Sequence, residues 1–304
     1  MRQRADFGDA GRERGGAGRF ARSIRWHRGT VPRTSDIDKE DDRSILFEQS
    51  LPEPLRETPM PTSLDIAFAI VFPILIVAVE VLYFNKRLKA RIAAGVPNAR
   101  RSAYRYVVIG EWGITAAALL LWARAHRPWD TLGLVPPRDW RLVPGILITA
   151  LIVAVSIRQF RAVRRLGVER RTALRGRLGA VEFFLPHTPA EHRWWLPLSL
   201  TAGFCEELLY RGFLTWLVAS YVGLPAAIGV VVVAFGLGHA SQGRSGVIKT
   251  GLVGLVLSII VVLTGWLVPA MIVHALLDIG AGQLGFAIYD DSRTSDSTET
   301  LISQ

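Results

Sequence analysis

The sequence predicts an all-α fold, a polytopic integral membrane helical bundle with about seven transmembrane helices. Three observations lead to this prediction. Half of the 304 residues are hydrophobic, and the mean hydropathy is +0.29. The apolar residues form long blocks and do not alternate with charged residues, as membrane-spanning helices require. Most of the arginines lie between these blocks. This pattern excludes a soluble enzyme.

Seven apolar segments are the candidate spans. In chain order they are Ile66–Phe84, Tyr106–Ala123, Leu142–Ile157, Trp194–Val218, Leu224–His239, Val247–Leu263 and Trp266–Ile288. Several are shorter than the about 20 residues that a span normally uses. One of the seven is therefore a candidate for a re-entrant segment that enters the bilayer without crossing it.

Basic residues in two of the connections carry most of the net charge of +10. They are Lys86, Arg87, Lys89, Arg91, Arg100, Arg101 and Arg105 in the first connection, and Arg158, Arg161, Arg164, Arg165, Arg170, Arg171, Arg175 and Arg177 in the third. Positive residues favour the cytoplasmic side, so both connections are predicted to be cytoplasmic and 126–141 to lie outside. The arginines flank the spans, and they are not interleaved with aromatic residues as in a nucleic-acid-binding surface. The expected partner is therefore the lipid bilayer, and nucleic acid is not expected to bind.

The two ends of the chain differ from its apolar centre. Residues 1–60 are rich in Arg, Gly, Asp and Pro, so they are predicted to be disordered, or untranslated if Met60 is the true start. Residues 61–288 form the predicted membrane-embedded domain, and 289–304 form a polar, acidic tail. The one cysteine, Cys205, excludes an internal disulfide and is interpreted as structural.

Three ionisable residues lie inside the apolar stretch from Trp194 to Tyr221, namely Glu206, Glu207 and Arg211. Together they cost roughly 8–10 kcal/mol in a spanning helix, so they are expected to have a function. Glu207 and Arg211 are four residues apart with the acid first, the favourable orientation for an ion pair. This pair is predicted to be architectural. Glu206 points elsewhere and remains available as a general base.

Two further apolar segments carry polar residues of the same kind. One ends with Phe235 and His239, and the other contains His274 and Asp278, which lie four residues apart on one helix face. A water held between Glu206 and His239, with His274 and Asp278 on the opposite side of a bound carbonyl, would supply the base, the orienting group and the oxyanion donor of amide hydrolysis.

These residues resemble the CPBP (CAAX protease and bacteriocin-processing) intramembrane endopeptidases, which include the CaaX prenyl endopeptidase. The family pattern is Glu-Glu-x-x-x-Arg, then Phe-x-x-x-His, then His-x-x-x-Asn or Asp. Its positions are matched in order by Glu206, Glu207, Arg211, Phe235, His239, His274 and Asp278.

The resemblance covers about Trp194–Ile288, and the first three spans match only as generic membrane sequence. It implies that the membrane-embedded domain, 61–288, is a protease of the cell membrane that cleaves a membrane-associated protein or peptide. The first Glu and first His of the pattern would activate water, and the later pair would steady the oxyanion. Glu206, His239, His274 and Asp278 are then the catalytic residues, supported by Glu207, Arg211 and Phe235. Asp278 stands where the prenyl endopeptidases carry Asn, so it could orient His274 or bind a metal instead.

Several alternatives stay open at this point. Zinc could be bound by the four catalytic candidates, although the His-Glu-x-x-His spacing is absent and metal-free glutamate catalysis is preferred. A non-catalytic immunity or scaffold protein of the same fold is a second interpretation. A proton-coupled transporter is a third, but no internal repeat supports it. Two other acids in apolar segments, Glu80 and Glu111, are interpreted as packing or interfacial partners, although Glu111, near the middle of its span, could contact a polar cavity.

Overall fold

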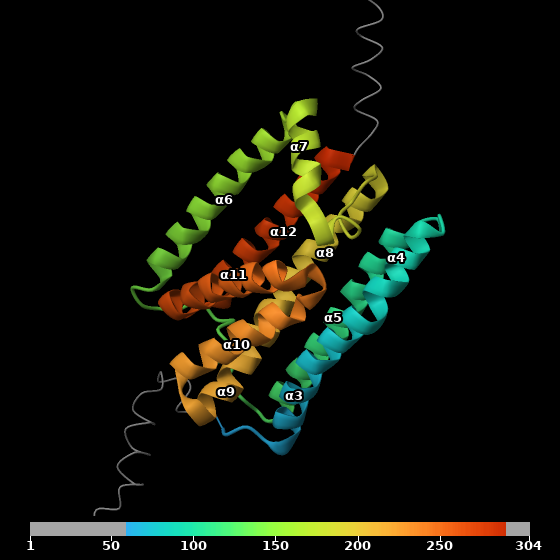
Figure 1. Ribbon diagram of the computed structural model, residues 1–304. Coiled ribbons are helices and arrows are strands. Elements are labelled where there is room, and N and C mark those ends of the chain that lie inside the picture. Colours follow the sequence, from blue (N-terminus) through green and yellow to red (C-terminus); the bar gives the residue numbers. More distant parts are fainter. Residues whose placement is uncertain (1–58, 290–304) are drawn as a thin grey trace, which may run out of the picture. The chain divides into compact units, whose positions relative to one another are not determined.

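The computed structural model describes residues 59–289, and all of their regular secondary structure is helical (Figure 1). The predicted all-α class is confirmed for this part of the chain. Apart from their innermost residues, the predicted tails over 1–60 and 289–304 lie outside the described residues.

The first half of the described chain contains three long helices and one shorter helix. The first is continuous through α3 (Ser63–Ala78), η1 (Val79–Phe84) and α4 (Asn85–Ala93), and η1 is a wider π-helical turn. Then follow α5 (Ala99–Arg124), α6 (Leu142–Arg164), α7 (Val168–Leu178) and the short turn η2 (Gly179–Val181). The start of α3 is fixed by a reciprocal capping box between Thr62 and Asp65.

The second half carries the three motifs. One continuous helix comprises α8 (Pro189–Glu207), the π-helical η3 (Leu208–Leu214) and α9 (Thr215–Val222). After it come α10 (Leu224–Gly238), the short turn η4 (Ala240–Gln242), α11 (Gly243–Thr264) and α12 (Leu267–Tyr289). A second capping box, between Thr188 and Glu191, starts α8 and defines the entry of the motif helix.

Within residues 59–289, five helices are long and apolar enough to cross a membrane. They cover Ser63–Ala93, Ala99–Arg124, Leu142–Arg164, Ala240–Thr264 and Leu267–Tyr289. These correspond to five of the seven candidate spans, so the chain is a multi-pass membrane protein. At ~1.5 Å per residue, the 15 residues of α10 reach about 22 Å, less than the ~30 Å hydrocarbon core. The helix from Pro189 to Val222 is also not among the five, and the count of about seven remains a prediction.

The helix α8 lies between α5 and α12 (Figure 1). On its far side α12 also packs against α6 and α11, while α10 packs against α11, α9 and α3. One close approach depends on Gly203, where a Cβ atom would come within 2.8 Å of the Ala275 backbone nitrogen and the Met271 carbonyl oxygen. Gly203 therefore lets α8 and α12 meet at backbone distance just before the two glutamates.

A buried ion pair joins the start of α3 to the segment that follows α5. Arg127 Nη1 donates to Asp65 Oδ1 at 3.0 Å, and both side chains are almost fully buried. The guanidinium of Arg127 also lies 4.3 Å from the ring centre of Trp216. Two elements far apart in the sequence are thus held to the aromatic core that surrounds η3.

Candidate active site

The first motif lies where the helix widens from α8 into η3. The π-helical turn begins directly after Glu207, and all seven of its residues are buried. Single π-helical turns inside α-helices occur frequently at functional sites, because the inserted residue changes the direction of the side chains that follow it.

The predicted ion pair between Glu207 and Arg211 is present. Arg211 Nη1 donates to Glu207 Oε1 at 2.8 Å, and the two side chains are 1% and 0% exposed. The guanidinium lies 4.0 Å from the ring centre of Phe235, so it is also held by a cation–π contact. Gly254 on α11 leaves the space that Arg211 and Phe235 occupy, since a Cβ atom there would lie 2.8 Å from Arg211 Nη2. Arg211 therefore connects three helices.

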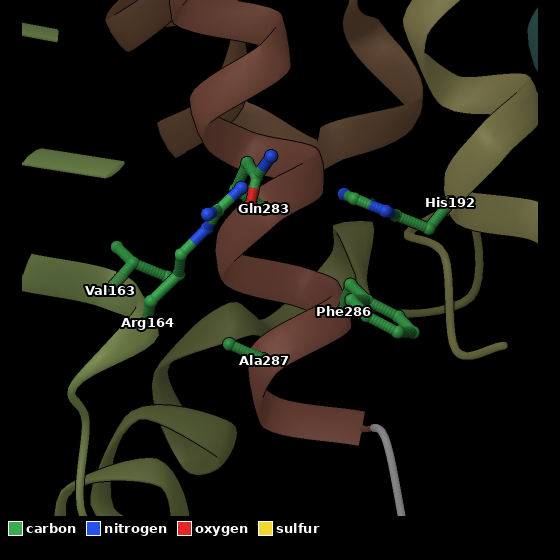
Figure 2. Close-up of a pocket in the computed structure, with 6 residues that line it drawn as sticks. All are labelled: Val163, Arg164, His192, Gln283, Phe286 and Ala287. Carbon is green, nitrogen blue, oxygen red and sulfur yellow. The ribbon is translucent and has the colours of Figure 1, made fainter. Parts of the chain in front are cut away.

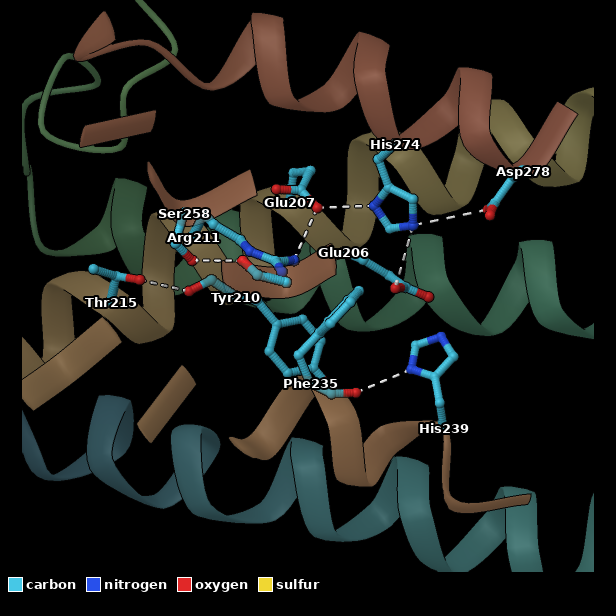
Figure 3. A network of polar contacts seen from close by, with 11 residues as sticks. Glu206, Glu207, Tyr210, Arg211, Thr215, Phe235, His239, Ser258, His274 and Asp278 are labelled. Carbon is cyan, nitrogen blue, oxygen red and sulfur yellow. Dashed lines mark hydrogen bonds and ion pairs between the residues drawn. The ribbon is translucent and has the colours of Figure 1, made fainter. Parts of the chain in front are cut away.

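Glu207 has a second partner that the sequence did not indicate. Its Oε1 atom also lies 2.8 Å from Nδ1 of His274, on α12 (Figure 3). With an ionised carboxylate, the Nδ1–H group of His274 donates this bond. The ion pair of Glu207 with Arg211 thus also holds the ring of His274. Glu207 therefore positions a residue of the site as well as stabilising the fold.

The other ring nitrogen of His274 faces the remaining two acids of the site. Nε2 lies 3.9 Å from Glu206 Oε2 and 3.8 Å from Asp278 Oδ2. Both distances exceed the ~2.7–3.2 Å of an N–H···O hydrogen bond, so Nε2 is committed to neither carboxylate. Glu206 and Asp278 keep 19% and 37% of their side chains exposed, whereas Glu207 is enclosed. Access to the site is therefore on the side of Glu206 and Asp278.

His239, at the end of α10, is oriented by its own helix. Its Nδ1 lies 3.0 Å from the Phe235 carbonyl oxygen, so Nδ1–H is the donor and Nε2 is left for another partner. Glu206 projects between the rings of His239 and His274 (Figure 3). The ring of Phe235 contacts both imidazoles, with centroid distances of 5.0 Å to His239 and 5.8 Å to His274. Phe235 is thus a spacer between the two histidines.

A tryptophan that the sequence analysis did not single out holds the third motif to the first. Trp195 Nε1 donates to the Asp278 carbonyl oxygen at 2.7 Å, which ties α8 to α12. The ring lies against Gly282, where any Cβ atom would overlap it. An indole N–H needs a partner when it is buried, but no pattern in the sequence indicates which carbonyl accepts from it.

Glu80 and Glu111 lie near the motif residues, so their interpretation as packing partners is incomplete. Glu80 accepts a hydrogen bond from the hydroxyl of Ser241, two residues after His239, and it interacts electrostatically with His239. Glu111, on α5, interacts electrostatically with Glu206. Its Oε2 atom is buried and has no hydrogen-bond partner within residues 59–289. Both acids contribute to the polar surroundings of the site.

The residues proposed as zinc ligands do not form a ready coordination site. Across residues 59–289, no three His, Cys, Asp or Glu side chains are arranged so that they could hold one metal ion. The imidazole of His274 is directed instead by Glu207, and that of His239 by a backbone carbonyl. The geometry does not fit a zinc centre, and the chemistry proposed below uses none.

A separate hollow of about 240 Å³ lies beyond the third motif, between α6, α8 and α12 (Figure 2). It is lined by Val163, Arg164, His192, Gln283, Phe286 and Ala287, none of which belongs to a motif. Its aromatic wall is formed by His192 and Phe286, which stack with ring centroids 4.5 Å apart. This hollow is distinct from the site around Glu206.

Comparison with known proteins agrees with the motifs. The family described as type II CAAX prenyl endopeptidase Rce1-like matches residues 189–280, which include every motif residue from Glu206 to Asp278. No curated protein and no solved structure gives a significant match to the chain. The resemblance predicted from the sequence is confirmed, because the model of the CAAX protease family matches residues 189–280.

Proposed function

We propose that the protein is an intramembrane endopeptidase of the cell membrane that hydrolyses a peptide bond in a membrane-associated protein or peptide. One observation carries this proposal. Glu206, from α8, lies between an imidazole from α10 and an imidazole from α12, and each ring is oriented through its Nδ1 atom by a separate partner. Two rings that present Nε2 toward one carboxylate form an arrangement suited to activating a water and binding a carbonyl oxygen.

The proposed reaction starts with a water between Glu206 and Nε2 of His239. Glu206 removes one proton from this water while the water oxygen attacks the carbonyl carbon of the substrate. The developing oxyanion accepts a hydrogen bond from Nε2–H of His274. Because Nδ1–H of that ring donates to Glu207, the ring must carry a proton on both nitrogens, and the surrounding carboxylates of Glu207, Glu206 and Asp278 favour that charge.

The tetrahedral intermediate then breaks its carbon–nitrogen bond. Glu206 returns the proton to the leaving amine, so the carboxylate is regenerated and one water is consumed for each peptide bond. In this mechanism the carboxylate of Asp278 favours the charged form of His274, Glu207 orients the ring, and Asp278 does not itself donate to the oxyanion. This role suits a carboxylate at the position where the prenyl endopeptidases carry Asn.

The proposal is tested by comparing the membrane proteomes of cells that express the wild-type chain or the Glu206→Gln variant. Cells with the wild type should contain new protein termini in membrane-associated proteins that are missing from cells with Glu206→Gln. Glu169→Gln is the matched control, since Glu169 is an exposed acid on α7. Its termini should match the wild type. Identical termini in all three would favour the non-catalytic scaffold interpretation instead.

A further inference from the structure

Four arginines surround a second hollow at the C-terminal end of α6. The hollow has a volume of about 630 Å³, within the roughly 300–1,000 Å³ of small-molecule sites. It is lined by Arg158, Arg161, Ala162, Arg165, Leu166 and Arg170. Positions 161 and 162 follow 158 by three and four residues, and 165 follows them by four and three, so all four lie on one face of α6. Arg170 comes from the first turn of α7.

These four guanidinium groups have no partner among residues 59–289. Within residues 59–289, no hydrogen bond, ion pair or ring contact involves any of them. Nearby arginines differ in this respect. Arg171 donates to the Leu166 carbonyl oxygen, and Arg175 lies over the ring of Tyr289. In the first connection, Arg100 and Arg105 are likewise engaged with protein groups. Setting the membrane topology requires positive charge, but it does not require four unpaired guanidiniums around one hollow.

The charge around the hollow is also poorly balanced along the chain. The segment from 158 to 177 contains eight arginines and a single acid, Glu169, which gives it a net charge of +7. An arginine fork binds phosphate oxygens through two parallel hydrogen bonds, and several forks around one hollow would bind a phosphate group strongly.

An exposed apolar surface leads to the hollow along the same face of α6. Leu147, Leu151 and Val155 are 63%, 65% and 45% exposed and follow one another every four residues. Arg158 comes three residues later on this face, after a segment that carries no charge from Leu142 to Ile157. A surface that is apolar for about 24 Å and then strongly cationic matches an amphiphile with acyl chains and an anionic head.

From this surface we propose that the hollow formed by Arg158, Arg161, Arg165 and Arg170 binds the phosphate of an anionic phospholipid, with the acyl chains on the apolar face of α6. Soluble phosphate compounds offer the same charge to the arginines. Such compounds have no acyl chain that could cover the apolar face of α6, so the lipid is the favoured source of the phosphate.

The test is a binding measurement on the full chain purified in neutral detergent, with phosphatidylglycerol that carries a fluorescent acyl chain as the probe. Replacing the four arginines by Gln should weaken binding by at least about tenfold, and replacing them by Lys should weaken it by only about threefold, because Lys keeps the charge and loses the fork. The matched control removes four positive charges from the first connection, at Lys86, Arg87, Arg101 and Arg105, and should leave the affinity within about twofold.

Two competitors separate the sources of the phosphate. Phosphatidylcholine should not displace the probe, and glycerol 3-phosphate should do so only at a concentration about 100-fold higher than unlabelled phosphatidylglycerol. Should the fourfold Gln variant not be recovered, the double variant Arg158→Gln with Arg165→Gln is measured, with an expected loss of about threefold. Unchanged affinity in the Gln variants, an equal loss in the control variant, or glycerol 3-phosphate competing as well as the lipid would each overturn the proposal.

Discussion

Glu207 connects the stability of the fold to the geometry of the site. One of its oxygens accepts from both Arg211 and His274, at 2.8 Å each. The neighbouring Glu206 makes no such contact, and its Oε2 atom has no hydrogen-bond partner within the described residues. Two adjacent glutamates therefore make different contacts, and their substitution should give different phenotypes.

Glu207→Gln should lower the free energy of unfolding by about 3–5 kcal/mol, because Arg211 is left as an unpaired buried charge. The double variant Glu207→Gln with Arg211→Gln should regain part of this stability, since the orphaned charge is removed. It should not regain peptidase activity, because His274 still lacks its carboxylate partner. Thermal unfolding and cleavage assays on the two variants check this separation. Recovery of full activity in the double variant would mean that Glu207 serves the fold alone.

Substitution of Glu111 tests whether this buried acid serves packing or the chemistry of the site. Within the described part of the chain its Oε2 atom is buried and has no hydrogen-bond partner, and such an atom costs about 1–3 kcal/mol. Glu111→Leu should therefore keep or raise the stability, by about 1 kcal/mol. If the carboxyl serves the site, cleavage by the same variant should fall by about tenfold, a change of ~1.4 kcal/mol in the activation free energy. A variant that is less stable but equally active would restore the packing interpretation.

Among the elements, the contact between α8 and α12 positions most of the site. It brings Glu207 to His274 and Trp195 to the Asp278 carbonyl, and it depends on Gly203. The π-helical η3 that follows Glu207 is buried over its whole length. Small changes in the spacing of these two helices should therefore displace the residues to which we assign catalysis.

Gly203→Ala should push α8 away from α12, because the new Cβ would lie 2.8 Å from backbone atoms that cannot rotate aside. We expect a loss of about 1–3 kcal/mol in stability and a lower turnover. Gly229→Ala is the matched control, since a Cβ on this α10 glycine meets nothing within 4 Å. Thermal unfolding and cleavage rates should be unchanged in the control. Equal behaviour of the two variants would contradict the role given to the α8–α12 contact.

The extent of the helices shows what hydropathy can and cannot predict. The predicted span Leu142–Ile157 marks the apolar part of α6, but the helix continues to Arg164. Likewise the motif helix runs from Pro189 to Val222, beyond the predicted Trp194–Val218. Hydropathy locates the lipid-exposed part of a helix, whereas its ends are determined by capping residues and by contacts with other elements.

Across the whole molecule, the features that could be predicted from the sequence are those that depend on local residue spacing and on the free-energy cost of a charge in an apolar helix. These two arguments identified the motif residues and the ion pair of Glu207 with Arg211. They did not predict the bond from Glu207 to His274, because 67 residues separate the two and only the packing of α8 on α12 joins them. The hydrogen bond of Ser241 to Glu80 was missed for the same reason.

The predicted membrane topology can be tested in intact cells. If both arginine-rich connections are cytoplasmic, a cysteine at Arg91 or Arg170 should resist a membrane-impermeant thiol reagent, and one at Pro137 should react. The native Cys205 is buried and free, so it should not contribute to labelling. Labelling at Arg170 from outside would overturn this topology.

In the proposed mechanism, Glu206 activates the water without a metal ion. The most direct measurement compares cleavage by the purified, reconstituted wild type and by Glu206→Gln after thorough chelation, with thermal unfolding measured for both. We predict that the chelated wild type cleaves its substrate and that Glu206→Gln does not, while their stabilities agree within about 1 kcal/mol. Cleavage by a folded Glu206→Gln variant, or wild-type activity that is lost on chelation and restored by zinc, would contradict the account.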